Sequence, residues 1–400
     1  MLPQIKYLPV NWMDGMKISD RHFIQLEHSI TDRLRDVSAS TINDFNYGLL
    51  PPSPGMRSAL DLQFYADQAN LIRVKLNECR AITGGGVRIE ISAGSNTEFK
   101  TFHKEIEASY SIKKANVNSL DIVVVVNPFS LVPSGTPDPD EIPIRYPYAL
   151  PEYRLEIVPS EQINQNQSAA FSLIVGRIKV SGDEIALDES FIPPCTTIQC
   201  YRPLEESYEY LRKQLFELGS AAMAITQKIR SEPKKTELAV NILYIAEKVL
   251  SYLSMVIPQH RMTIMQGPPI LMFEKLSSLG YVISAAVNCT PDKEREKMFN
   301  YWKQWIEMSQ SQFENAVMGV MNIEYNHLNI APALQSTTKF VNVIVKLFKQ
   351  LSKLKYIGEQ KDSGIVIGET FEPVTRQENR PEPVVPKEKP KAGGWSFLTD

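Results

Sequence analysis

A change in the spacing of apolar residues near position 200 constrains the fold more than any other feature of this sequence. After Pro203, apolar side chains recur in alternating steps of four and three residues, at Leu204, Tyr208, Leu211, Leu215, Leu218, Ala222, Ile225 and Ile229. Heptad spacing of this kind keeps one apolar stripe on one side of a long helix, where a neighbouring helix covers it. A second run follows over residues 238–256, and Pro233 between the runs ends the first helix. The sequence therefore predicts a helical hairpin.

Further helices are predicted over residues 270–287, 292–321 and 333–356, where apolar residues recur at helical spacing. The heptad stripe needs a covering surface, and two alternatives provide one. Another helix of the same chain can cover it, as in a helical bundle, or identical copies of the chain can meet there in a seam between subunits. The spacing alone leaves both alternatives open.

Before residue 200 the apolar residues alternate with polar ones, as at Ile72, Val74 and Leu76. This alternation places one face of a strand on a core and the other face in water. Strands are predicted over residues 60–64, 72–76, 87–91, 120–126, 153–158, 171–180 and 185–187. Residues 180–185 are typical of a hairpin turn. A short helix is predicted over residues 22–38, with an apolar stripe of Phe23, Leu26, Ile30 and Leu34.

These patterns predict an α+β chain with four parts. Residues 1–198 form an antiparallel β-sandwich, residues 199–330 a helical bundle, residues 331–358 a terminal helix and residues 359–400 a disordered, proline-rich tail. The tail nevertheless ends in an apolar cluster of Trp395, Phe397 and Leu398, which is typical of a short docking peptide. An inert chain end is the alternative interpretation of this cluster.

Composition excludes several classes of protein. Lys and Arg number 43 against 46 Asp and Glu, which gives a net charge of −3, whereas nucleic-acid binding requires a basic surface. Continuous apolar runs are far shorter than the roughly 18 residues that cross a bilayer, and the first residues do not resemble a secretory signal. Four cysteines are too few for a disulfide framework and favour a reducing compartment. We therefore expect a cytoplasmic protein that binds no nucleic acid and does not insert into a membrane.

A search for catalytic and ligand-binding motifs finds none. Gly84–Gly86 lacks the helix and the Lys-Ser/Thr pair of a phosphate loop, and it predicts a turn. The five histidines form no HExxH motif, and no GxSxG motif is present. The cysteines lack pairs at zinc-ligand spacing, so all four are predicted to be small buried hydrophobic residues. We expect no catalytic residue, no metal, no cofactor and a protein that is not an enzyme.

The N-terminal segment carries the most specific signal. A Trp precedes an acidic-Gly-Met turn and a His-Phe pair that opens a helix, at Trp12, Asp14, Gly15, Met16, His22, Phe23 and Gln25. This arrangement resembles the start of the TssK family, a baseplate subunit of type VI secretion systems. Residues 187–195 resemble the passage from the shoulder to the neck of that family, and residues 267–280 resemble one of its neck helices. Residues 325–327 resemble the entry to its head domain.

The resemblance implies a structural subunit. Proteins of the TssK family are homotrimers with a β-sandwich shoulder, a helical neck and a C-terminal head. The shoulder binds the baseplate wedge proteins TssF and TssG, and the head reaches the cytoplasmic component of the membrane complex. The resemblance therefore implies a phage-like, contractile-injection baseplate that is docked at the inner membrane. It also favours the interpretation of the heptad stripe from Leu204 to Ile229 as a seam of the trimer.

Several alternatives remain open at this stage. The motif residues are candidates for wedge binding, whereas Trp12, Met16 and Phe23 can equally belong to the core of the β domain. The chain departs from the family after residue 330, where one helix and a tail replace the head. We hypothesise that the cluster from Trp395 to Leu398 takes over the head's contact or binds another baseplate component. A phage-like tail-tip adhesin and a carbohydrate-active β-sandwich enzyme are alternative functions for this architecture.

Overall fold

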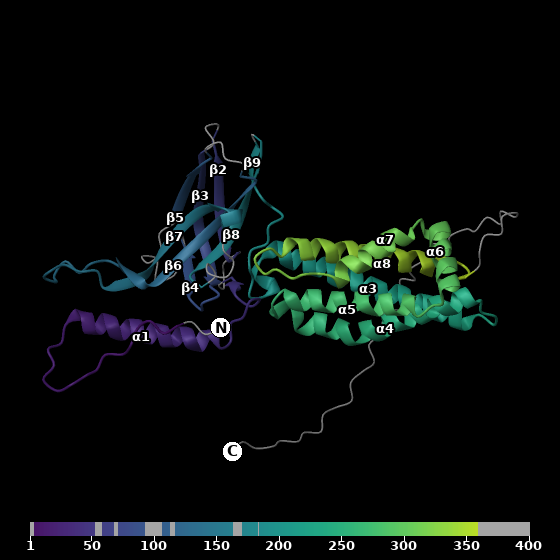
Figure 1. The fold of residues 1–400 in the computed structure, drawn as a ribbon, viewed down its shortest axis with the longest axis horizontal. Coiled ribbons are helices and arrows are strands. Elements are labelled where there is room, and N and C mark those ends of the chain that lie inside the picture. Colours follow the sequence, from purple (N-terminus) through teal and green to yellow (C-terminus); the bar gives the residue numbers. More distant parts are fainter. Residues whose placement is uncertain are drawn as a thin grey trace, which may run out of the picture.

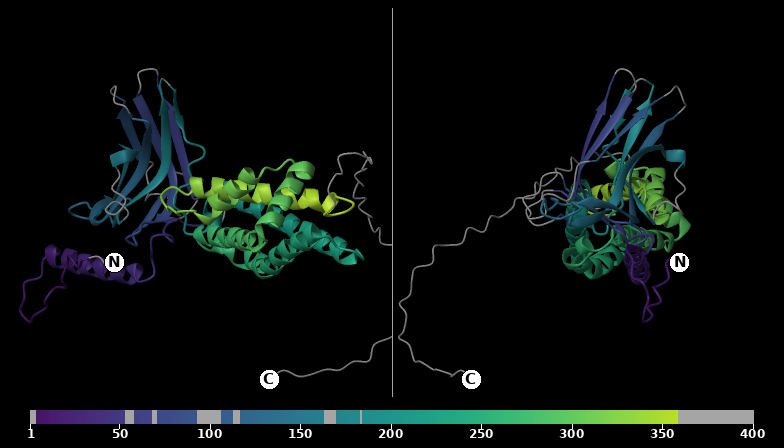
Figure 2. Two further views of the ribbon diagram at one scale, coloured as in Figure 1. Left: turned by 45° about the vertical axis from the view of Figure 1, so that its right-hand side comes forward. Right: turned by 90° about the vertical axis from the view of Figure 1, so that its left-hand side faces the viewer.

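Strands and helices occupy different regions of the chain. The computed structural model describes residues 4–52, 58–67, 71–92, 106–112, 117–162, 170–182 and 184–358. We call residues 48–187 the β half and residues 202–353 the helical half; the two lie beside each other in Figure 1. One further helix, α1 (Asp20–Ala39), lies beside the β half and extends away from the helical half, as Figure 1 and the left view of Figure 2 show.

The β half contains two antiparallel sheets. In the first sheet, the long strand β3 (Leu71–Ile82) pairs with β1 (Gly48–Leu49), β2 (Leu60–Ala66), β4 (Arg88–Ser92) and β5 (Ile106–Ser111). The second sheet has the order β7 (Tyr148–Pro159), β6 (Ser119–Ser134), β8 (Ser172–Ser181) and β9 (Glu184–Leu187). The apolar side chains that alternate along β3 and β6 are buried in one shared core. The predicted α+β class and the antiparallel pairing are confirmed, although the sequence pattern does not predict β1 and β5.

Strands β6 and β7 are longer than their apolar patterns predict, and together they form an arm beyond the sheet. Strand β8 pairs with β6 only as far as Val125, whereas β7 remains paired with β6 up to Ser134. We call residues 127–152 the arm. It is a two-stranded hairpin with a long tip, and it projects from the β half away from the helical half (Figures 1 and 2).

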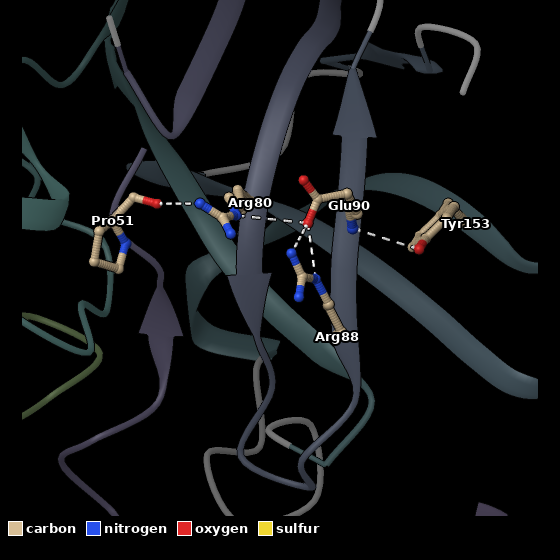
Figure 3. A network of polar contacts seen from close by, with 5 residues as sticks. All are labelled: Pro51, Arg80, Arg88, Glu90 and Tyr153. Atoms are coloured by element: carbon tan, nitrogen blue, oxygen red, sulfur yellow. Dashed lines mark hydrogen bonds and ion pairs between the residues drawn. The ribbon is translucent and has the colours of Figure 1, made fainter. Parts of the chain in front are cut away.

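A polar network joins the first sheet to strand β7 of the second (Figure 3). Arg80 on β3 donates to the carbonyl of Pro51 at 2.8 Å, and its Nε lies 3.7 Å from Oε2 of Glu90 on β4. Arg88 Nη2 lies 2.6 Å from the same carboxylate oxygen. The backbone N–H of Glu90 donates to the hydroxyl of Tyr153 on β7, at 3.4 Å. The network therefore fixes β7 at the point where the arm leaves the sheet.

The helical half contains six α-helices among its described residues. They are α3 (Arg202–Ser231), α4 (Glu237–Met262), α5 (Ile270–Asn288), α6 (Asp292–Ile306), α7 (Gln310–Met321) and α8 (Ala331–Lys353). The predicted hairpin is present, because α3 ends before Pro233 and α4 begins after Thr236, whose hydroxyl accepts a hydrogen bond from the N–H of Ala239 at 3.1 Å.

The heptad stripe of α3 is covered inside one chain. Its eight residues from Leu204 to Ile229 are each at most 1% exposed, and α3 packs against α4 and α8. The prediction that these eight residues form a seam between copies of the chain is therefore wrong. Helices of the same chain already occupy the stripe, which is the alternative that the spacing had left open.

Helix α8 is part of this packing and is not a separate terminal element. Its residues Phe340, Ile344 and Phe348 are buried in the same core as the stripe of α3. Lys349 also forms an ion pair with Glu217 of α3, with Nζ and Oε2 2.5 Å apart. The predicted boundary at residues 330 and 331 thus does not separate two packing units.

The long helix predicted over residues 292–321 is two helices. The chain leaves helical geometry at Glu307, which has a left-handed φ of 54°. Ser309 then begins α7: its hydroxyl accepts from the N–H of Gln312 at 3.2 Å, and the Gln312 side chain accepts from the N–H of Ser309 at 3.1 Å. This reciprocal cap is the Ser-x-x-Gln signal in the sequence, and the prediction overlooked it.

Buried hydrogen bonds connect the two halves. The N–H of Leu49 donates to the carbonyl of Pro194 at 2.8 Å, and His327 Nε2 donates to the carbonyl of Tyr47 at 2.7 Å. Because this nitrogen donates, the neutral ring accepts at Nδ1, where the Tyr325 hydroxyl lies 2.6 Å away. Residues 325–327 therefore hold the helical half against β1, a role that the sequence did not reveal.

Helices α4 and α5 are long and apolar enough, by length and composition alone, to cross a membrane. The expectation of no such segment considered only continuous apolar runs. Both helices place apolar side chains, including Ile242, Val249, Phe273 and Leu276, in the core of the helical half. Packing within the chain accounts for part of their composition, since 33% of the apolar window of α4 and 44% of that of α5 is buried.

Two buried histidines make the stability of the fold dependent on pH. Burial lowers the pKa of His327 to about 4, and burial together with Lys275 and Arg212 lowers the pKa of His260 to about 4. The folded chain thus keeps both rings neutral, whereas the unfolded chain protonates them near the ordinary pKa of about 6.5. Stability is complete above about pH 7 and falls as the pH drops from 6.5 toward 4.

We predict that the free energy of unfolding at pH 5 is lower than at pH 7.5 by about 2 kcal/mol for each of these histidines. Urea unfolding at the two pH values measures the difference. The variant His260→Phe removes one contribution and retains an aromatic ring beside Tyr208. An unchanged pH dependence in this variant would contradict the assignment.

Candidate docking surface

Helix α1 turns its apolar side away from the protein. Three of the four residues of its stripe are exposed and Leu26 is partly buried; Phe23 is 58% and Leu34 is 61% accessible to solvent. Its buried residues lie on the opposite side of the helix and are Ser29, Asp32 and Arg35. A surface helix normally buries the apolar side and exposes the polar one. The predicted helix is confirmed, but its orientation is the reverse of the usual one.

A buried carboxylate joins α1 to the N-terminal segment that precedes it. Asp32 Oδ2 accepts hydrogen bonds from the backbone N–H groups of Lys6, at 2.6 Å, and Tyr7, at 2.9 Å. Asp32 Oδ1 accepts from Arg35 Nη1 at 3.0 Å. Burial acts to raise the pKa of the Asp32 carboxyl, but the two backbone hydrogen bonds and Arg35 outweigh it and leave the pKa below its ordinary value. The carboxylate thus stays ionised and ties the N-terminal segment to the helix.

Phe129, at the root of the arm, is the aromatic centre against which α1 rests. Its ring centroid lies 4.7 Å from that of Tyr7 and 5.4 Å from that of His28. The Arg35 guanidinium lies 5.7 Å from the Phe129 centroid and 4.7 Å from that of Phe171. Cation–π contacts of this kind satisfy a buried cation on the faces that the carboxylate does not reach. The inner side of α1 is therefore polar in composition, and Arg35 contacts both the carboxylate and the two rings, although its Nε has no hydrogen-bond partner among the described residues.

The predicted N-terminal motif forms a tight turn that leads into α1. The N–H of Met16 donates to the carbonyl of Met13 at 3.2 Å, and Gly15 supplies the positive φ of 79° that this turn requires. His22 Nδ1 accepts from the backbone N–H of Ser19 at 3.1 Å and so caps the start of the helix. The turn and the cap fix where the motif's aromatic side chains lie.

The structure brings Trp12, His22 and Phe23 together at the surface. The ring centroid of Trp12 lies 6.0 Å from that of His22 and 6.3 Å from that of Phe23. Trp12 is 45% exposed, Asp14 and Gly15 are exposed, and Met16 and His22 are partly buried. The alternative that Trp12 and Phe23 belong to the core is wrong, because the space beneath α1 is filled by the Asp32 network. We call residues 4–39 the N-terminal prong.

The remaining predicted residues are the tail cluster and the four cysteines. Trp395, Phe397 and Leu398 lie outside the described residues. Cys79, Cys195 and Cys200 are buried as predicted, whereas Cys289 is exposed, and the prediction for that residue is wrong. Within the described part of the chain, no group of three or more His, Cys, Asp or Glu side chains has the geometry to hold a metal ion.

Known proteins resemble this chain only through their structures. No protein-family model and no curated protein matches the sequence. A crystal structure of TssK is similar, with 16% sequence identity, coverage of 86% of this chain and 69% of that one, and a TM-score of 0.49. TssK in the TssK-TssF-TssG baseplate subcomplex of the type VI secretion system, seen by cryo-electron microscopy, has 15% identity, coverage of 84% and 100%, and a TM-score of 0.42.

A third similar structure is TssK from T6SS EAEC in complex with nanobody nb18. It has 12% identity, coverage of 78% of this chain and 66% of that one, and a TM-score of 0.43. The three similar structures contain TssK, the family that the N-terminal motif resembles, and each differs widely from this chain in sequence. These similarities concern the fold and leave the role of the N-terminal prong to be tested directly.

We predict that Asp32→Ala loosens the N-terminal segment from α1. The substitution leaves Arg35 buried without its carboxylate, which costs about 3 kcal/mol for a buried pair, and removes the acceptor for two backbone N–H groups. Hydrogen–deuterium exchange should become faster in peptides covering residues 4–39 and remain unchanged in the helical half. Glu27→Ala is the matched control, because Glu27 is an exposed acid on the same helix. Equal exchange in both variants would show that Asp32 does not hold the N-terminal segment to the helix.

Proposed function

We propose that this chain is a structural baseplate subunit of a type VI secretion system and that it binds wedge proteins of the TssF and TssG kind through its N-terminal prong. The contact residues in this proposal are Trp12, Asp14, Gly15, Met16, His22 and Phe23, together with the exposed stripe of α1. The N-terminal motif supports the choice of family. The choice of partners follows the similar structure in which TssK is assembled with TssF and TssG. The proposed role requires no catalysis.

One observation carries the proposal: a rigidly held helix presents its apolar stripe to solvent. A loosely attached helix could rotate and bury the stripe, but the Asp32 network and Phe129 fix the opposite side. Large contiguous apolar surfaces of soluble proteins mark interaction sites. Aromatic anchors such as Trp12 and Phe23 are typical of the residues that contribute most to binding.

The proposal places a second contact at the other end of the molecule. The described chain ends at Gly358, whose carbonyl accepts from the hydroxyl of Thr236 at 3.3 Å, in the turn region between α3 and α4. Gly358 therefore lies at the end of the helical half where α3 gives way to α4, the end farther from the β half. We propose that Trp395, Phe397 and Leu398 bind a cytoplasmic component of the membrane complex, so that the chain links the wedge to the membrane from the cytoplasmic side.

Homotrimer formation belongs to the same proposal, with contacts different from the buried stripe. Phe216 and Met223 lie seven residues apart on α3, and both are exposed. A seven-residue spacing places them on one side of the helix, where another copy can cover them.

We predict a solution mass of three chains by light scattering. The variant Phe216→Ser/Met223→Ser should lower this mass, whereas Tyr281→Ser on α5 should not. A wild-type chain that is monomeric would contradict the trimer.

We predict that Trp12→Ala and Leu34→Ala each weaken binding to a purified TssF–TssG complex by about 30-fold, the factor expected when a residue contributing about 2 kcal/mol is lost. Both side chains are exposed, so the variants should fold and melt like the wild type. Titration calorimetry measures the affinity, and Tyr281→Ala is the matched control on an exposed aromatic residue of the helical half. Full affinity in both prong variants would rule out the N-terminal prong as the binding surface.

A further inference from the structure

The arm exposes large apolar side chains to solvent. Its exposed large hydrophobic residues are Leu131, Val132, Ile142, Ile144, Tyr146 and Tyr148, and Ile142 is 97% exposed. An isolated two-stranded hairpin buries little and is marginally stable in water. A hairpin that carries apolar residues on such an extension is unusual for a surface that only contacts solvent.

The arm is nevertheless held firmly at its root. Ser130 Oγ donates to Glu152 Oε2 across the two strands at 2.9 Å, and the side chain of Asn127 accepts from the N–H of Phe129 at 3.1 Å. Tyr153, the next residue of β7, accepts from the N–H of Glu90 in the first sheet (Figure 3). The arm therefore leaves the sheet in a defined direction.

The arm and the N-terminal prong project from the same end of the molecule. Both extend from the β half away from the helical half in the views of Figures 1 and 2. Phe129 belongs to the arm and packs against Tyr7 and His28 of the prong, so their roots are joined. Among the described residues before position 200, every exposed large hydrophobic residue except Tyr65 lies on one of these two elements. The apolar surface of this half is thus concentrated on two neighbouring projections.

We propose that the arm is the second jaw of the docking surface and that the two projections together grip one amphipathic helix with basic residues beside its apolar side. This inference rests on the proposed function and specifies its partner. The stripe of α1 from Phe23 to Leu34 has the spacing that a second helix covers. The arm resists the other common mode, addition of a strand, because Pro133 and Pro151 lie within its strands and lack the N–H group that strand pairing uses.

The charge of the arm determines the expected flanks of that helix. Asp138 and Asp140 at the tip are exposed, and neither is in an ion pair with a described residue. Glu141, in contrast, is paired with Arg145 at 2.8 Å. The Asp138 carboxylate accepts the backbone N–H of Asp140 at 2.9 Å, and both carboxylates keep a charge that no described cation neutralises. Two such charges close in sequence to Ile142 and Ile144 favour a partner with Lys or Arg next to its apolar residues, since charged rims of opposite sign accelerate association and fix register.

The test uses the full chain and a purified TssF–TssG complex. We expect the arm variant Ile144→Ser/Tyr146→Ser to weaken binding by at least tenfold while its circular dichroism and melting curve match the wild type. Tyr65→Ser, on an exposed tyrosine of β2, is the matched control and should bind normally. The variant Asp138→Asn/Asp140→Asn should reduce the dependence of the association rate on salt concentration.

Two outcomes separate this inference from the proposed function. If the arm variant binds like the wild type while Leu34→Ala loses affinity, the arm is not a jaw and the proposed function stands. If the wild type does not bind the complex, the proposed function fails and the inference fails with it. A photo-crosslinking amino acid at position 142 identifies the occupant: a crosslink to a basic amphipathic helix supports the inference, and a crosslink to a strand or only to another copy of this chain overturns it.

Discussion

One buried carboxylate joins α1 to the first residues of the chain. Asp32 accepts from two backbone N–H groups of the chain's first residues and from Arg35, so it fixes both the N-terminal segment and the helix. A buried carboxylate remains ionised only when hydrogen-bond donors and a cation replace the water molecules that would solvate it. The polar side of α1 faces the protein, so the apolar side faces solvent. The docking surface thus lies on the side of the helix opposite this polar interaction.

Phe129 extends this constraint to the arm. The same ring that contacts Tyr7 and His28 belongs to the strand that continues into the exposed hairpin. At the other end of α1, a Cβ added to Gly86 would lie 2.4 Å from Cβ of Ser38, so only glycine permits this close contact with the turn between β3 and β4. The helix is therefore held at its middle and its C-terminal end, and its N-terminal turn with Trp12 is the part that reaches farthest from these contacts.

Sequence patterns predicted those features that depend on local periodicity. The alternation at Ile72, Val74 and Leu76 identified β3, and the heptad steps after Leu204 identified α3. In both elements the apolar residues recur at the period that places them on one buried side. The choice of covering surface for α3 is not local: the buried residues of α8, more than a hundred positions away, cover the stripe that a second copy was expected to cover. The orientation of α1 was inaccessible for the same reason, since a pattern of Phe23, Leu26, Ile30 and Leu34 does not state which side meets the protein.

The helical half buries its apolar residues, whereas the N-terminal prong and the arm expose many of theirs, and this difference has an energetic consequence. In α3 the stripe contributes to folding, at roughly 1.5–3 kcal/mol for each fully buried large side chain. On α1 and the arm the same kinds of residue contribute nothing to folding and remain available for binding. Association must first offset the lost freedom of two molecules, about 4–15 kcal/mol, so a single exposed stripe supplies limited affinity. Two rigid projections that contact one helix add apolar area without adding flexible elements to be ordered, which explains why the fixed root at Phe129 matters as much as the exposed side chains.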